Sequence, residues 1–403
     1  MNSRKYPKKK NLCTFQHHKI IVSNGQTVEE IQISQIIVWI CFSLLSIITI
    51  RYYFAKNSLR EIQNCKKLAS NQRILIILPF RNEESILKKT LPRVIDEISS
   101  DKNCKLVLVN SASRDKSVEL VLKIIGESDL VTDLWALINS DKPGKGRALN
   151  LAMSNYETGD IVVMIDADAM VPNDSLGTFR TMFSNEEIGA ISGLESAHSG
   201  DPMASYKTRS NELRIFESSN GHCPILEGSL IAWAPSRIGW SSFDENSNAD
   251  DAQIALQTIR SGHRSHVEPK LQFTTTRDSK KASFQRSVRR SQGLNKQLLR
   301  NIDLLWNPNC PQFRSTFLFN ILLHCVIPWC VIILLSAPLF FIGYPDPALD
   351  NLHVFSMLPS LIIVISLFSS SGRTLLRGSL ASVFGQFRVL LRMRTDNWEP
   401  GEG

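Results

Sequence analysis

Three long apolar segments constrain this 403-residue chain more than any other feature of its sequence. They cover residues 33–54, 316–342 and 352–371, and a long stretch of mixed character separates the first from the second. A helix that crosses a bilayer core requires about 20 mostly apolar residues, and each segment meets that length. We therefore expect three transmembrane helices attached to one soluble domain. Three helices buried in a large protein core are the alternative.

Basic residues beside the first segment indicate its orientation. Lys56 and Arg60 follow it, whereas Glu29 and Glu30 precede it. Basic residues favour the cytosolic side of a span, so the soluble domain is expected in the cytosol and the protein in the cell membrane as a multi-pass protein. The net charge of +8 is explained by these residues and by a phosphate-handling site, and we expect no nucleic acid as a partner.

The predicted organisation is as follows: a basic N-terminal tail (1–32), a transmembrane helix (33–54), a linker (55–72), the soluble domain (73–294), an interfacial segment (295–315), two further transmembrane helices (316–342 and 352–371) and a cytosolic tail (372–403). The eight cysteines show no C-x-x-C pairing, which predicts neither a zinc site nor a disulfide framework.

Short apolar segments alternate with amphipathic helical segments in the soluble domain. Strands are predicted at Arg73–Leu78, Lys105–Val109, Leu134–Ile138 and Asp160–Ile165. This alternation is typical of an α/β domain built on a largely parallel sheet. Ligands bind such sheets outside the carboxyl ends of the strands.

Two carboxylates, Asp166 and Asp168, follow the fourth predicted strand. Side chains two residues apart on a strand project to the same side. Two carboxylates there repel each other unless a cation lies between them, and a hard divalent cation that bridges a diphosphate is the natural occupant. We expect Mn²⁺ or Mg²⁺, and a solvated strand end is the alternative.

Polar residues also lie at other predicted strand ends and helix starts. Asn82 and Glu83 follow the first strand, where they either contact a ribose or base or cap the next helix. Lys145 lies between Gly144 and Gly146 before a helix, which is favourable for binding an anion, although a solvated turn would look similar.

A pair of acidic residues and a group of basic residues complete the candidate site. Asp250 and Asp251 begin a helix. Their negative charges either stabilise the helix N-terminus by interacting with the helix dipole, or one of them supplies a general base. Arg286 and Arg290 share a helix face, within a cluster that also holds Gln285 and Arg289. Such a cluster stabilises a leaving diphosphate or forms a basic patch at the membrane surface.

The order of these motifs resembles that of family 2 glycosyltransferases of the GT-A fold, in the membrane-bound branch that includes cellulose and hyaluronan synthases. The resemblance covers about residues 73–294 and is carried by the segments Ile77–Ser85, Val109–Ser117, Lys142–Ala152, Ile165–Asp168, Asn248–Arg264 and Gln285–Gly293. It implies an α/β, Rossmann-like GT-A domain and an inverting transfer of a sugar from a nucleoside-diphosphate-sugar to a lipid-linked or polysaccharide acceptor.

The resemblance also implies roles for individual residues. Asp251 would be the catalytic base and Asp168 the metal ligand. The donor would be a UDP-sugar, held by Pro79, Asn82, Glu83, Asn110, Lys145 and Asp166. The acceptor and the diphosphate would be met by Asp250, Gln285, Arg286, Arg289 and Arg290.

Two residues depart from the family pattern. Asn110 stands where an Asp usually contacts the base, and Arg290 stands where polymer-forming members usually have a Trp. The second difference weakens the case for a processive polysaccharide synthase, which remains an alternative. A sugar-1-phosphate nucleotidyltransferase and an inactive membrane scaffold are further alternatives. The first would require a Gly-rich loop after the first strand, which PFRNEE lacks, and Asn110 is the best support for the second.

Overall fold

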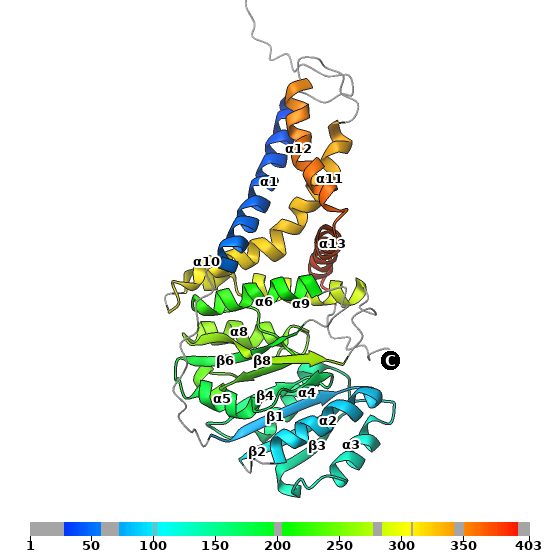
Figure 1. Ribbon diagram of the computed structural model, residues 1–403, viewed down its shortest axis with the longest axis vertical. Coiled ribbons are helices and arrows are strands. Elements are labelled where there is room, and N and C mark those ends of the chain that lie inside the picture. Colours follow the sequence, from blue (N-terminus) through cyan, green and yellow to red (C-terminus); the bar gives the residue numbers. More distant parts are fainter. Residues whose placement is uncertain are drawn as a thin grey trace, which may run out of the picture.

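The computed structural model describes residues 28–57, 72–99, 101, 103–196, 204–276, 284–307, 309–341 and 350–393. It consists of an α/β domain and a group of helices that extends away from it (Figure 1). The predicted tail up to residue 27, the predicted linker from residue 58 to 71 and the last ten residues lie outside the described residues.

One eight-stranded sheet forms the α/β domain, with the strand order β3-β2-β1-β4-β7-β6-β8-β5. The strands are β1 (Ile74–Phe80), β2 (Cys104–Ser111), β3 (Trp135–Ser140), β4 (Ile161–Ile165), β5 (Ala169–Met170), β6 (Ile188–Glu195), β7 (Leu230–Trp233) and β8 (Arg264–Thr275). The first four strands pair in parallel, as predicted. Strand β7 runs antiparallel to both β4 and β6, so the complete sheet is mixed.

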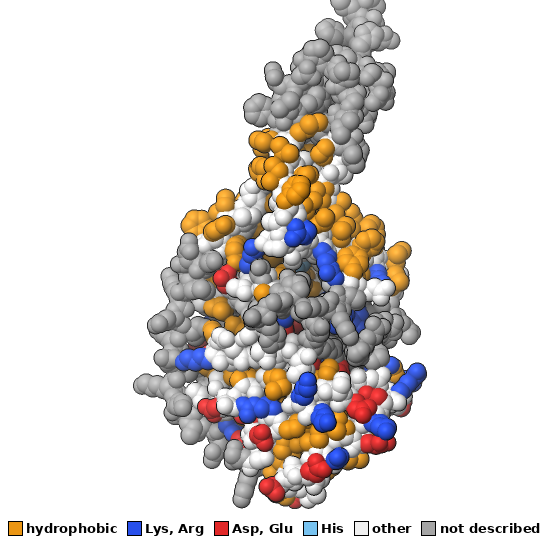
Figure 2. Space-filling model, turned by 45° about the vertical axis from the view of Figure 1, so that its right-hand side comes forward, with side chains coloured by type: hydrophobic (Ala, Val, Ile, Leu, Met, Phe, Trp, Pro, Cys, Tyr) orange, Lys and Arg blue, Asp and Glu red, His pale blue; other side chains and the backbone are white. Residues whose placement is uncertain are grey.

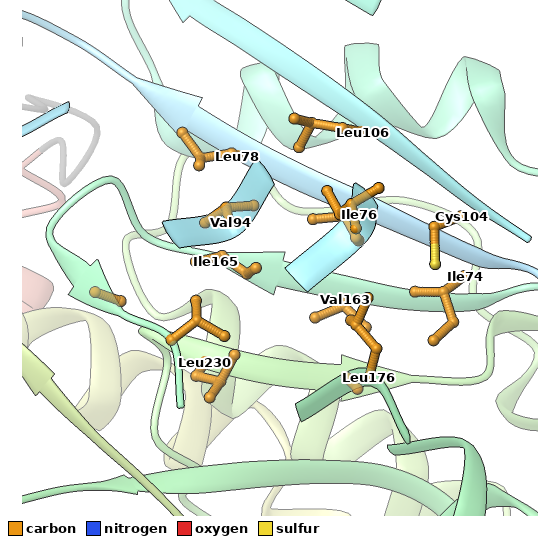
Figure 3. Packing of buried hydrophobic residues seen from close by; sticks show 14 of the residues in the cluster. Ile74, Ile76, Leu78, Val94, Cys104, Leu106, Val163, Ile165, Leu176 and Leu230 are labelled. Carbon is orange, nitrogen blue, oxygen red and sulfur yellow. The ribbon is translucent and has the colours of Figure 1, made fainter. Parts of the chain in front are cut away.

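Helices cover both faces of the sheet, and every residue of β1 and β4 is therefore buried. Ile74, Ile76 and Leu78 face one core, which Figure 3 shows, whereas Leu75 and Ile77 face the other. The helices of the domain are α2 (Glu84–Ser99), α3 (Ser117–Gly126), α4 (Lys145–Ala152), α5 (Ser175–Phe183), α6 (Ala204–Ser219), α7 (Pro235–Ile238), α8 (Asp250–Arg260) and α9 (Phe284–Arg300).

The remaining helices lie outside the α/β domain. They are α1 (Val28–Asn57), α10 (Phe313–Ile321), α11 (Ile327–Phe341), α12 (Asp350–Ser366) and α13 (Ser370–Leu390). We call α1, α11 and α12 the stalk, because they extend together from the domain (Figure 1). Within the described residues, Ile33–Phe54 and Phe313–Pro338 are long and apolar enough to cross a membrane, and a third span results if the bent pair α12–α13 is counted.

The C-terminal end differs from the predicted organisation. The third span was expected to continue to residue 371, but α12 ends at Ser366 and the chain bends by 108° into α13. Helix α13 occupies much of the predicted cytosolic tail, and α9 continues through the predicted domain boundary at residue 294. Hydropathy did not reveal the bend, because it depends on a local cap: Ser369 Oγ accepts a hydrogen bond from the backbone N–H of Gly372.

A π-helical turn, Leu322–Val326, connects α10 to α11. Pro328 has no N–H to donate to the carbonyl of His324 four residues earlier. Ser382 Oγ of α13 donates to that carbonyl at 2.7 Å, and Gln386 Nε2 donates to the carbonyl of Cys325 at 3.1 Å. Polar side chains of α13 therefore satisfy carbonyls at this π-helical turn.

Candidate active site

Three of the predicted motifs meet at the side chain of Lys145. Its Nζ lies 2.7 Å from Asp166 Oδ1, just past β4, and 2.9 Å from Asp250 Oδ2, at the start of α8. Burial works against the charge on Lys145, but the two carboxylates outweigh it and raise the pKa of the ammonium. The structure thus brings together one residue from each of three segments that lie far apart in the sequence.

The backbone around Lys145 explains why glycines flank it. Gly144 has a φ of +154°, and its N–H donates to Ser111 Oγ at the end of β2. A Cβ at Gly146 would lie 3.2 Å from the Cα of Glu245 and 3.3 Å from the carbonyl oxygen of Asp244. The close approach of the chain at these two residues positions the first turn of α4, and with it Lys145, at the carboxyl ends of the strands.

The two acidic residues of α8 have different surroundings. Asp250 is paired with Lys145, whereas the carboxylate of Asp251 accepts a hydrogen bond from the neighbouring N–H of Ala252. Burial raises the pKa of Asp251 to about 7, and the charges of Asp250 and Glu227 add to this effect. A carboxyl with a pKa near 7 is suited to act as a general base at neutral pH.

An ion pair that the sequence analysis missed lies beside Asp251. Arg214 Nη1 of α6 is 2.7 Å from Glu227 Oε2, and the two side chains are only 17% and 19% exposed. The next residue, Gly228, approaches Asp251 so closely that a Cβ there would lie 3.3 Å from the Asp251 Cβ. Neither Arg214 nor Glu227 belongs to a recognisable motif, so only the folded structure shows that this ion pair adjoins the candidate base.

The predicted nucleoside-binding residues gather at the ends of β1 and β2. Pro79 lies in β1 opposite Val109. Asn82 has a φ of +51°, and its Oδ1 accepts a hydrogen bond from the backbone N–H of Arg114 at 2.7 Å. Glu83 is 2% exposed and precedes α2, and its N–H donates to Ser117 Oγ. These contacts hold together the loops after the two strands.

Asn110 is held by two hydrogen bonds of its side chain. Its Nδ2 donates to Asn139 Oδ1 of β3, and its Oδ1 accepts from the N–H of Ser113, both at 2.9 Å. The amide thus satisfies one donor and one acceptor at once, which a carboxylate could not do in this position.

The basic cluster occupies the first turns of α9. Gln285 and Arg290 are exposed, whereas Arg286 and Arg289 are half-buried. The backbone oxygen of Arg289 accepts a hydrogen bond from Asn248 Nδ2 at 2.9 Å, two residues before Asp250. The cluster is therefore attached to the chain segment that leads into the acidic pair.

The carboxylates Asp166 and Asp168 fit a cation that a diphosphate helps to coordinate. No group of three or more His, Cys, Asp or Glu side chains gathers as a metal site within the described part of the chain. Mg²⁺ and similar ions need only one or two protein carboxylates when substrate phosphates supply other ligands. The turn after β4 also fixes both residues, since the N–H of Asp166 donates to the carbonyl of Ser229 and the carbonyl of Asp168 accepts from Thr276.

The parallel strands and the D-x-D turn lie in a part of the chain that matches known proteins. Residues 75–224 match the model of the family Glycosyl transferase family 2. These residues form a family 2 glycosyltransferase domain. An undecaprenyl-phosphate 4-deoxy-4-formamido-L-arabinose transferase from Shewanella sediminis is 29% identical over 122 residues, which are 27% of this chain and 36% of that protein. A dolichyl-phosphate beta-glucosyltransferase from Trichomonas vaginalis is 25% identical over 180 residues, which are 43% of this chain and 53% of that protein.

The likeness to a solved structure extends beyond the matched domain. A mannosyltransferase from Pyrobaculum calidifontis, solved in complex with GDP-Man and Mn²⁺, is 22% identical to the chain. It aligns with a TM-score of 0.75 over 90% of this chain and 100% of that one. The fold of the family 2 domain is therefore GT-A, as the sequence predicted. The alignments to the two curated relatives span about a third and a half of their lengths.

Proposed function

We propose that this chain is a membrane-anchored glycosyltransferase that moves a sugar from a nucleoside-diphosphate-sugar to a lipid-linked phosphate acceptor. The observation that carries the proposal is the convergence of Lys145, Asp166 and Asp250 beside Asp251, in a domain of the GT-A fold. The convergence supports a site in which the Lys145 ammonium, the carboxylate turn after β4 and a candidate base lie together at the carboxyl ends of parallel strands.

The donor would lie across the ends of β1, β2 and β4. Asn82, Asn110 and the loops that they hold would contact the nucleoside, and Lys145 would contact the diphosphate. A divalent ion held by Asp168 and Asp166 would neutralise negative charge on the departing diphosphate. The basic cluster of α9, with Arg286 and Arg289, would add positive charge on the same side.

Asp251 would accept the proton of the acceptor hydroxyl as the sugar is transferred. Burial raises the pKa of Asp251, and the negative charge of Asp250, which pairs with Lys145, adds to this effect. Attack from the side opposite the leaving diphosphate inverts the configuration of the sugar.

The names of the two relatives support a lipid-phosphate acceptor. One is described as acting on undecaprenyl phosphate and the other on dolichyl phosphate. The apolar helices of this chain would bring such a lipid to the domain, and the catalytic domain would face the cytosol. A UDP-sugar or a GDP-sugar is expected as donor, since the solved mannosyltransferase binds GDP-Man.

A transfer assay tests the proposal. Purified full-length protein in nanodiscs would be incubated with Mn²⁺, a panel of radiolabelled UDP- and GDP-sugars, and undecaprenyl or dolichyl phosphate. We expect label in the lipid extract together with nucleoside diphosphate, and loss of both in Asp251→Asn. Nucleotide-sugar turnover that needs no acceptor lipid and leaves no label in the lipid fraction would overturn the assignment of the acceptor.

A further inference from the structure

Helix α13 carries an exposed apolar stripe that the proposed reaction does not use. Phe384, Phe387 and Leu390 are 46–74% exposed, although they belong to a helix whose opposite face is buried, and Leu391, just after the helix, is 71% exposed. Phe284 of α9 extends the stripe, because its ring contacts that of Phe384 edge to face at a centroid distance of 6.0 Å. Monomeric soluble proteins seldom expose a contiguous apolar patch of this kind without a partner.

The structure builds a firm corner that directs α13 away from the axis of α12. A Cβ at Gly372 would lie 2.0 Å from the carbonyl oxygen of Ser366, so the close approach at the bend requires glycine. Arg373 Nη1 donates to the carbonyls of Leu367 and Phe368, which follow α12 in the corner. Helix α13 is thus held at a large angle to α12 and at the base of the stalk (Figure 1).

The buried face of α13 fixes it to the catalytic domain. A Cβ at Gly385 would lie 2.8 Å from the backbone nitrogen of Gln292, so the two helices cross in close contact. Asn295 Nδ2 of α9 donates to Ser382 Oγ at 3.1 Å, and Arg209 of α6 donates to Ser371 Oγ at 2.7 Å. The exposed stripe therefore has a fixed direction relative to the domain.

Charge and continuity indicate what covers the stripe. Helix α13 contains three arginines and no Asp or Glu, and Arg392 lies two residues after its end. The exposed apolar surface continues into the corner, where Phe368 is 84% exposed, and onto α12, where Ile365 is 57% exposed. Figure 2 shows hydrophobic side chains gathered around the base of the stalk with Lys and Arg side chains among them. Apolar residues beside arginines and without acidic residues are typical of helices that lie at an anionic bilayer surface.

We propose that α13 is a surface helix that lies in the plane of the membrane, with its aromatic and leucine stripe in the acyl boundary and its arginines at anionic lipid headgroups. Because α13 is fixed to α9 and α6, this contact sets the orientation of the catalytic domain on the membrane. The proposal concerns the position of the protein on the bilayer and does not depend on the transfer reaction.

Fluorescence quenching tests the position of the stripe. A fluorescent non-natural residue would replace Phe384 in the full-length protein, and in a control it would replace Glu119 of α3, which is exposed at the far end of the domain. Nanodiscs would contain either phosphatidylcholine alone or an equal mixture with phosphatidylglycerol. We expect brominated acyl chains to quench the probe at residue 384 at least several-fold more than the probe at residue 119, and iodide to show the reverse.

The charge arm uses Arg388→Gln combined with Arg392→Gln. These changes should reduce bromolipid quenching at residue 384 in the anionic nanodiscs to the level seen in phosphatidylcholine alone. If iodide quenches both probe positions equally, the stripe faces water and the proposal is wrong. If neither quencher reaches residue 384 and energy transfer appears between labelled copies, a second copy of the chain covers the stripe, which also overturns the membrane assignment.

Discussion

The pH dependence of sugar transfer tests the environment of Asp251 directly. Burial, together with the charges of Asp250 and Glu227, raises the pKa of Asp251 to about 7. A general base acts in its deprotonated form, so its active fraction grows as the pH rises through that value. We expect kcat/KM to increase by about tenfold from pH 6 to pH 8, the change in ionised fraction for one group that titrates near 7.

Two substitutions next to Asp251 should move this titration in opposite directions. Glu227→Gln removes a negative charge, which lowers the pKa of Asp251 and shifts the acid limb of the profile to lower pH. Arg214→Gln removes the positive charge that pairs with Glu227, which raises the pKa of Asp251 and shifts the limb to higher pH. Opposite shifts cannot arise from a general loss of stability, which would lower the rate at every pH.

The assay is the rate of labelled-lipid formation at subsaturating acceptor between pH 5.5 and 8.5, with thermal unfolding of each variant as a control. Asp251→Asn should lower turnover by about 10²–10⁴-fold at every pH, the range for general-base catalysis. If the acid limb stays in place in both charge variants, or shifts in the same direction in both, Asp251 is not the titrating base.

Three further predictions concern the metal, the helix crossing and a buried carboxyl. Asp168→Asn should abolish transfer and the Mn²⁺-dependent part of donor-induced thermal stabilisation, while the unfolding temperature without ligands stays unchanged. Gly385→Ala should destabilise the protein in detergent by about 1–3 kcal/mol because of the 2.8 Å approach, whereas Gly378→Ala, which meets open space, should stay within about 0.5 kcal/mol of wild type. Burial raises the pKa of Glu217 from 4.5 to about 7, so the native state binds more protons than the unfolded state between these two pH values. Thermal stability should therefore fall as the pH rises from 4.5 to about 7. The Glu217→Gln variant should not show that fall.

The sequence predicted the parallel half of the sheet because those strands are continuous apolar runs separated by helical periods. Residues 74–80 and 161–165 are buried on both faces of the sheet. Such strands can be recognised from their own continuous apolar sequence, without knowing which strands they pair with. Strand β7 is equally apolar, but its antiparallel pairing depends on where α6 returns the chain to the sheet. Local patterns do not encode that path. The corner after Ser366 was missed for a related reason, since hydropathy measures composition and the bend depends on a serine cap and a close glycine contact.

The candidate site was predictable where each residue lies in a recognisable segment. Asp166, Lys145 and Asp250 come from three such segments, and the structure places them in contact. The sequence could not show that the two neighbouring acids of α8 have different surroundings. In the structure, Asp250 pairs with Lys145, whereas Asp251 accepts a hydrogen bond from the N–H of Ala252. Arg214 and Glu227 had no motif to mark them, because their meeting depends on how α6 and the loop before β7 fold together.

Helix α9 connects α13, at the base of the stalk, to the acidic pair. On one side, Gly385 of α13 approaches the backbone of α9 at Gln292. On the other side, a Cβ at Gly293 would lie 2.0 Å from Asn248 Oδ1, and Asn248 donates to the carbonyl of Arg289. Asn248 lies two residues before Asp250, so the start of α8 is packed against a helix that α13 holds in place. The position of the acidic pair is therefore linked through α9 to packing that begins at the base of the stalk, and α9 itself continues through the predicted domain boundary at residue 294.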